Sequence, residues 1–333
     1  MNGKLVYYFG GDKAEGSLFG KLSFQASERV NLFGDVQFRL IDYRIAGIDN
    51  DLRDITQQHS YFFFNPKLGA YVDLNDASHA YLSFGIGNRE PNRSTLVDAN
   101  PALPAPAAET LYNAEAGYKF RGKKFSVNAN VYYMHYRDQL VLTGKINDVG
   151  DPVMENVPNS YRSGIEMQFG FIFTKSLRWD LNGTFSLNKI IGFTEYVDNW
   201  DDYPNQVVAD LGTTDIAFSP NILAGSRLQW EPVHWLDLAL FSKYVGKQYI
   251  DNTSSDDRTL DPYLVNDLVI SCDLRIKSLE KFSLSLKINN LFNAEYETNA
   301  WVYRYYSEGS YGKYDGYFPQ AGINFLVGVD LKF

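Results

Sequence analysis

The sequence predicts an all-β protein, a transmembrane antiparallel β-barrel, from three observations. Segments in which apolar and polar residues alternate recur along the 333 residues, and about fourteen can be read. The connections between these segments alternate between very short and very long. Aromatic residues make up 16% of the chain, yet the mean hydropathy is only −0.29. No run of about 18 apolar residues is present, which excludes a transmembrane helix. This combination is typical of strands that cross a bilayer with one apolar face.

The clearest alternation lies in the last part of the chain, residues 281–333. Between Lys281 and Asn289 every second residue is apolar, and the residues between them are polar. A period of two is the period of a β-strand. The chain then closes with a second alternating segment that ends at Phe333. A strand that runs to a C-terminal phenylalanine suits a barrel, whose last strand must pair with another strand to close the sheet.

The other strands follow the same pattern, with polar residues such as Ser, Asn, Gln and Asp between the apolar ones. We expect them at Leu18–Phe24, Leu32–Leu40, Leu68–Leu74, Ala80–Ile86, Tyr112–Phe120, Phe125–Tyr133, Ile165–Phe173, Leu177–Leu187, Ile222–Leu228, Leu236–Leu240 and Leu268–Ile276. Alternation alone fits a soluble β-sandwich equally well, because a strand with one buried face has the same period.

The connections distinguish the two architectures. The short ones are expected near Ala26–Arg29, Asn75–Ser78, Arg121–Lys124, Thr174–Ser176, Glu231–His234 and Lys277–Glu280. The long ones are expected at Ala46–Gln58, Asn88–Glu109, Thr143–Ser160, Glu195–Ser219, Gly246–Pro262 and Phe292–Gly316. Strict alternation places every long loop at one end, as in a barrel with tight periplasmic turns and long extracellular loops. A Greek-key sandwich would mix long and short connections. Aromatic residues flank several short turns, where a membrane-interface girdle is expected.

Composition excludes several classes of function. The net charge of −9 argues against a nucleic-acid partner. The only cysteine, Cys272, rules out an internal disulfide framework and a cysteine zinc cluster. The four histidines show no metal-ligand spacing, and no nucleophile motif or phosphate-binding loop is present. We therefore expect no enzyme activity, no cofactor and no catalytic metal. The acidic patches at residues 198–202 and 251–257 favour solvated loops over a Ca²⁺ site.

One aromatic stretch is the main candidate for ligand contact in the extracellular loops. Its proposed residues are Trp301, Tyr303, Arg304, Tyr305 and Tyr306. Rigid amphipathic rings beside an arginine suit an aromatic, anionic ligand such as a ferric chelate. The alternative is a girdle of aromatics at the membrane surface. Arg89 and Arg93 either meet the same anionic ligand or brace the loops against acidic residues. Inward charges such as Glu166 and Arg227 are expected to form a network in the lumen.

Several stretches together resemble the C-terminal barrel part of TonB-dependent outer-membrane receptors, especially those of Bacteroidetes-like bacteria. Leu286–Tyr296 (LKINNLFNAEY) is similar to the family's penultimate-strand signature, and the terminal strand fits as well. Other matching stretches, each weak alone, are Gly87–Arg93, Tyr161–Glu166, Tyr249–Thr253 and Leu260–Tyr263. Their order and spacing extend the resemblance from about residue 10 to the end.

The resemblance implies a 22-stranded barrel in the outer membrane of a Gram-negative cell, with a plug domain and a segment that contacts TonB. Residues 1–333 supply about fourteen strands, so we expect the C-terminal part of such a barrel, with N-terminal strands, plug and signal peptide missing. The implied function is active uptake of a scarce solute, a ferric siderophore or another iron complex. The implied partners are outer-membrane lipid and the TonB–ExbB–ExbD complex, reached through the plug region. A passive porin-like barrel and an importer of oligosaccharide or cobalamin remain open.

Overall fold

The computed structural model describes the chain except for residues 1–7, 50–51, 98, 100–104, 147–151, 204, 275–278, 280 and 333. Phe333, at which the last strand is expected to end, therefore lies outside the described residues. The expected turn near Lys277–Glu280 also lies outside them, apart from Leu279. Within the described part, no helix has both the length and the apolar character needed to cross a bilayer.

The elements are almost entirely strands. Those of the first half are β1 (Tyr8–Ser27), β2 (Val30–Ile48), β3 (Gln57–Asn75), β4 (Ser78–Arg89), β5 (Glu109–Arg121), β6 (Phe125–Ile146), β7 (Pro152–Thr174) and β8 (Leu177–Asn199). Those of the second half are β9 (Gln206–Asp215), β10 (Ile222–Val233), β11 (Leu236–Val245), β12 (Gln248–Tyr249), β13 (Thr259–Leu260), β14 (Tyr263–Leu274), β15 (Lys281–Asn289), β16 (Glu297–Ser307), β17 (Ser310–Pro319) and β18 (Asn324–Lys332). One short helix, α1 (Arg93–Val97), and one 3-10 turn, η1 (Trp200–Asp202), complete the described elements.

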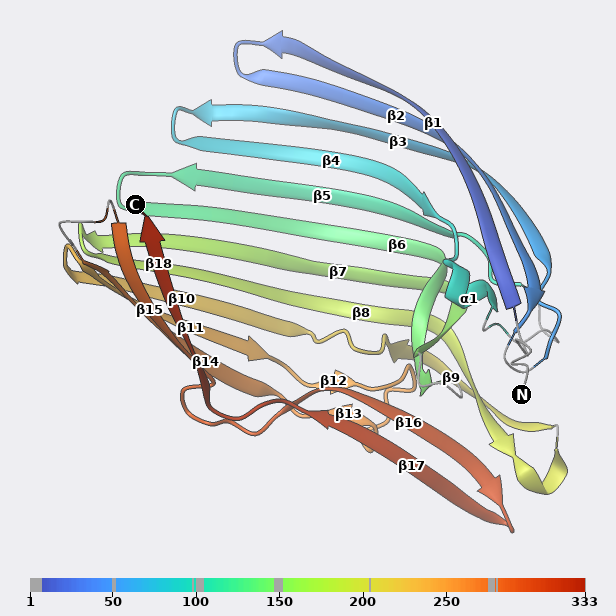
Figure 1. The fold of residues 1–333 in the computed structure, drawn as a ribbon. Helices are drawn as coiled ribbons and strands as arrows, with labels where there is room; N and C mark the ends of the chain where they lie inside the picture. Colours follow the sequence, from blue (N-terminus) through green and yellow to red (C-terminus); the bar gives the residue numbers. More distant parts are fainter. Residues whose placement is uncertain are drawn as a thin grey trace.

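Sixteen strands form one curved sheet, which confirms the all-β class (Figure 1). Neighbours along the chain pair as antiparallel hairpins in the order β1 to β8, then β10, β11, β14, β15 and β18. Three strands lie off this path: β9 pairs with β8, β16 pairs with β8 and β17, and β17 pairs with β16. β1 and β18 are the two ends of the path in the part of the chain that the structure describes. The turns at the left of Figure 1 are short, as expected, and the long connections gather at the opposite end. We call these the short-turn end and the long-loop end.

Much of the apolar surface of the described strands is not buried in a core. Large hydrophobic side chains along the strands remain exposed on the outward face, such as Leu22 (72%), Leu82 (61%) and Val327 (69%). The buried apolar clusters instead lie at the long-loop end, around Ile45, Ile190 and Ile250. A wall one strand thick with an apolar outward face needs a non-aqueous surrounding, because so much exposed apolar surface is costly in water.

Four of the long connections contain strands, and here the sequence-based expectation was wrong. The expected loop Gly246–Pro262 contains the short pair of β12 and β13. β6 and β7 extend to Ile146 and Pro152. β8 continues to Asn199 and pairs with β9, within the expected loop Glu195–Ser219. The expected loop Phe292–Gly316 holds most of a long hairpin made of β16 and β17. Backbone amides in such extensions are satisfied by ladder hydrogen bonds, so these segments are rigid projections of the wall.

Aromatic rings pack over glycines on neighbouring strands at several positions. Phe33 lies against Gly69, Tyr81 against Gly117 and Tyr132 against Gly164, and each pair is directly opposite across the ladder. A Cβ at any of these glycines would collide with the facing ring. Glycine therefore leaves room for the ring to lie flat on the neighbouring strand. The Tyr81 hydroxyl reaches one strand further and donates to Asn130 Oδ1 at 2.9 Å.

Candidate ligand-binding site

The β16–β17 hairpin leans against the β8–β9 hairpin at the long-loop end. Tyr305 and Tyr306 of β16 form parallel bridges with Asp198 and Asn199 of β8. The hydroxyl of Tyr303 donates to Asp198 Oδ2 at 3.0 Å. Two hairpins that are far apart in sequence thus form one wall of the long-loop end (Figure 1).

A carboxylate holds the tip of the hairpin. The backbone N–H groups of Glu308 and Gly309 donate to Asp201 Oδ1 and Oδ2 at 2.6 and 2.9 Å. Both residues have positive φ, 52° and 68°, as a two-residue turn of type I′ requires. Glycine tolerates this conformation without strain. The turn points two consecutive amides toward one carboxylate, and a charged acceptor makes such hydrogen bonds stronger than neutral ones.

Arg258 connects three elements behind the tip. Its side chain, 7% exposed, contacts Asp251 Oδ2 at 2.7 Å and Glu195 Oε1 of β8 at 2.6 Å. Its Nη2 also donates to the Tyr311 hydroxyl of β17 at 2.7 Å. Burial alone lowers the pKa of the guanidinium, but the charges and hydrogen bonds of Asp251 and Glu195 outweigh burial and raise it. Arg258 is therefore charged at every physiological pH.

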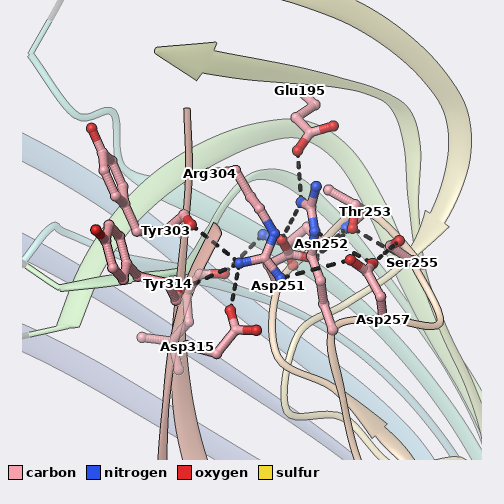
Figure 2. Close-up of polar contacts among 12 residues, drawn as sticks. Glu195, Asp251, Asn252, Thr253, Ser255, Asp257, Tyr303, Arg304, Tyr314 and Asp315 are labelled. Atoms are coloured by element: carbon pink, nitrogen blue, oxygen red, sulfur yellow. Dashed lines mark hydrogen bonds and ion pairs between the residues drawn. The ribbon is translucent and has the colours of Figure 1, made fainter. Parts of the chain in front are cut away.

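Arg304 of β16 is the second buried guanidinium, 4% exposed. Its Nη1 donates to Asp315 Oδ1 of β17 and to backbone carbonyls of Tyr303 and Tyr314 (Figure 2). Asp257 lies between the two arginines, 3.8 Å from Arg258 Nε and 3.9 Å from Arg304 Nη2, beyond hydrogen-bond distance. The hydroxyl of Ser255 donates to Asp257, and this bond lowers the carboxyl pKa, aided by both arginines against a smaller effect of burial.

Three nitrogens of this pair carry no hydrogen bond. They are Arg258 Nε, Arg304 Nε and Arg304 Nη2, each buried and without an acceptor among the described residues. Buried donors are satisfied in the great majority of cases, by protein or by ordered solvent. These three donors are exceptions to that rule, and two of them lie 3.8 and 3.9 Å from the carboxylate of Asp257.

A cavity of about 640 Å³ opens beside both arginines. This volume lies within the range of small-molecule sites. Its wall carries three guanidinium groups and three carboxylates, from Arg53, Arg258, Arg304, Glu155, Glu195 and Asp251. The exposed ring of Tyr196 and the apolar side chains of Phe193 and Val302 complete part of the lining. The cavity therefore joins polar donors, apolar contact surface and balanced charge.

The structure separates the residues expected to bind ligand. It brings only Arg304 to this cavity. The rings of Trp301 and Tyr305 lie over Gly316 and Gly312 of β17, and Tyr306 packs against Tyr311 at 5.2 Å between ring centroids. These rings stabilise the hairpin, so the description of the stretch as a loop was wrong. Tyr303 contacts Asp198, as described above.

The two other candidate arginines lie elsewhere at the same end. Arg89 forms an ion pair with Glu109 Oε2 at 3.0 Å. This contact corresponds to the alternative in which the arginine braces a loop against an acidic residue. Arg93 is the first residue of α1. The sequence reasoning did not identify Arg258, Glu195 or Asp251 as site residues, although residues 251–257 were noted as an acidic patch. The only signal in the sequence was the position of Arg258 directly after that acidic patch.

The inner face near the short-turn end is also polar. A hollow of about 1070 Å³ is lined by Glu166 and Arg227, as expected for inward charges, together with Arg178 and Asp180. Arg178 pairs with Asp180 at 2.8 Å. Across the described residues, no group of three or more His, Cys, Asp or Glu side chains is arranged to hold a metal ion.

The comparisons with known proteins agree with this architecture. The family described as TonB dependent receptor-like, beta-barrel matches residues 2–291. The pesticin receptor of Yersinia enterocolitica is 20% identical over 299 residues, which cover 84% of this chain and 41% of the receptor. The chain thus spans less than half of the curated relative that it matches.

Solved structures share the fold at low identity. The siderophore receptor PiuA of Acinetobacter baumannii matches with a TM-score of 0.75 at 14% identity, over 98% of this chain and 44% of PiuA. The copper transporter OprC matches with a TM-score of 0.71 at 17% identity, over 97% of this chain and 48% of OprC. These relatives are named as receptors and transporters, not enzymes, in agreement with the expected lack of catalysis. The chain belongs to the TonB-dependent receptor β-barrel family.

Proposed function

We propose that this chain forms part of the wall of an outer-membrane receptor that takes up a ferric siderophore or another iron complex by TonB-dependent transport. The observation that carries the proposal is the 640 Å³ cavity at the long-loop end of a sheet of this family. A ligand site among the long loops faces the outside of the cell in this architecture. The pesticin receptor and PiuA, both similar to this chain, are receptors by name, and PiuA is named for siderophores.

The surroundings follow from the same proposal. The apolar outward face of the sheet would contact lipid of the Gram-negative outer membrane. Residues 1–333 would act as one unit, the C-terminal part of a larger barrel. Energy would come from the TonB–ExbB–ExbD complex acting on a plug region, which the family resemblance places before the barrel. The outer membrane has no ATP supply, so mechanical coupling to the inner membrane is a physical requirement for active uptake.

The direct test is uptake of ⁵⁵Fe by cells that carry or lack the gene, each with and without TonB. We expect uptake of at least one supplied iron complex to need both the gene and TonB. Uptake that needs the gene but not TonB would indicate a passive porin-like barrel instead. Unchanged uptake of every iron complex after deletion would refute the iron proposal, and labelled copper, cobalamin and oligosaccharide would then be tested in the same cells.

A further inference from the structure

We infer that the cavity between Arg258 and Arg304 selects an uncharged, oxygen-rich ligand and disfavours an anionic one. This inference rests on the proposed function, which it makes more specific. It departs from the aromatic, anionic chelate that the sequence suggested.

The charges on the cavity wall are already balanced. Each arginine on the cavity wall already has a carboxylate partner: Arg53 pairs with Asp49, Arg258 with Asp251 and Glu195, and Arg304 with Asp315. Asp257 adds a further negative charge between the last two. A paired guanidinium in a buried site attracts an anion weakly, because the incoming charge also meets the carboxylate already present.

The long-loop end around the cavity carries an excess of negative charge. Three segments, residues 189–219, 243–263 and 295–316, surround the cavity on its β8, β12–β13 and β16 sides. They contain six Lys and Arg residues and fourteen Asp and Glu residues. This excess accounts for most of the net charge of −9 of the chain. A negative potential of this kind lowers the local concentration of anions and slows their association.

Uncharged polar side chains also line the cavity, among them Thr194 and Gln206. Neutral carbonyl or hydroxyl oxygens hydrogen-bond to groups of this kind without adding charge. The exposed ring of Tyr196 and the side chain of Phe193 offer flat apolar contact on the same cavity. Balanced charge, uncharged polar groups and aromatic surface together fit a neutral ligand rich in carbonyl or hydroxyl groups, from either of two sources: a ferric hydroxamate complex or an oligosaccharide.

The test is a binding series on the intact receptor, purified in detergent and studied by isothermal titration calorimetry. The probes are a neutral ferric tris-hydroxamate complex, a neutral gluco-oligosaccharide and the strongly anionic ferric tris-catecholate complex. We expect at least one neutral probe to bind roughly tenfold or more tightly than the anionic complex. The preference should weaken as salt is added, because salt screens the surrounding field.

Two substitutions locate the effect. Arg304→Lys keeps the positive charge beside Asp315 but removes the planar guanidinium from the cavity wall, so binding of the neutral probe should fall roughly tenfold. Arg178→Lys makes the same change in an Arg–Asp pair at the short-turn end and should leave binding unchanged. Asp257→Asn removes a negative charge beside both arginines and should strengthen binding of the anionic complex, a gain that misfolding does not produce.

The outcomes separate this inference from the iron proposal. Binding of the oligosaccharide alone would support the neutral-ligand site and refute the iron substrate. Preferential binding of the tris-catecholate complex would refute the neutral-ligand site and keep the iron substrate. Failure of both neutral probes to bind would also overturn the inference.

Discussion

Replacing Arg258 by methionine tests whether one buried side chain holds the two hairpins together. The substitution supplies an unbranched apolar side chain but removes the ion pairs to Asp251 and Glu195 and the hydrogen bond that Arg258 Nη2 donates to the Tyr311 hydroxyl. Breaking a buried ion pair costs about 3–5 kcal/mol, because the remaining charges lose their compensation. We place the cost near the lower figure, about 3 kcal/mol, since Asp251 keeps hydrogen bonds from Thr253 at 2.6 and 3.1 Å.

The effect should be local. The long sheet retains its ladders, so only the docking of residues 297–319 on β8 should weaken, and its opening should rise roughly 100-fold. Hydrogen exchange with mass spectrometry measures this as lost protection in β16 and β17 with no change in β2 to β6. Arg178→Met breaks an exposed pair of similar length and should change exchange little. If Arg258→Met left exchange of the hairpin within about threefold of the wild type, the assignment of Arg258 as the connecting residue would be wrong.

Three further predictions concern other parts of the fold. Asp201→Ala removes both acceptors at the hairpin tip, so hydrogen exchange at the amides of Glu308 and Gly309 should become roughly fivefold faster, because about 1 kcal/mol of exposed charge-assisted hydrogen bonding is lost. Unchanged exchange would show that the turn alone holds the tip. The pKa of Asp257 is lowered in the folded chain, so this carboxylate stabilises the fold fully above its ordinary pKa of 3.8, and the stabilisation is lost as the pH falls below that value. NMR should therefore show hairpin docking unchanged between pH 5 and 8 and weakened only in acid. Gly117→Val would force the ring of Tyr81 from its place and should lower the free energy of unfolding, measured in urea, by about 1–3 kcal/mol. Gly87→Val is the control, because a Cβ at that position meets nothing within 4 Å.

The strands of the wall were predictable because side chains alternate across a strand with a period of two, and each strand has one apolar and one polar face. Lys281–Asn289 and Leu177–Leu187 each alternate, and both fall within strands of the structure. The short turns were predictable as well, because only a few residues separate the alternating segments on either side of them. Physical patterning of this kind is local and therefore visible in one sequence.

The hairpin β16–β17 was not predictable by the same argument. Its sequence carries aromatic residues on both faces, as in Trp301, Tyr305 and Tyr306, so it lacks the division into one apolar and one polar face. Without alternation the segment resembles a loop. The site around Arg258 was missed for a different reason. Glu195 lies 63 residues from Arg258 in sequence, and nothing local indicates that they meet.

The aromatic rings that cover glycines have a consequence for assembly as well as for stability. Moving a strand by one residue would turn Tyr81 to the outward face and leave Gly117 uncovered, and moving it by two would press the ring against a residue that has a Cβ. Phe33, Tyr81 and Tyr132 repeat this arrangement in the β2–β3, β4–β5 and β6–β7 pairs, so the shapes of the facing residues favour one register in each pair. Similar strands in a long sheet could otherwise pair in many offsets, and these three pairs limit that choice.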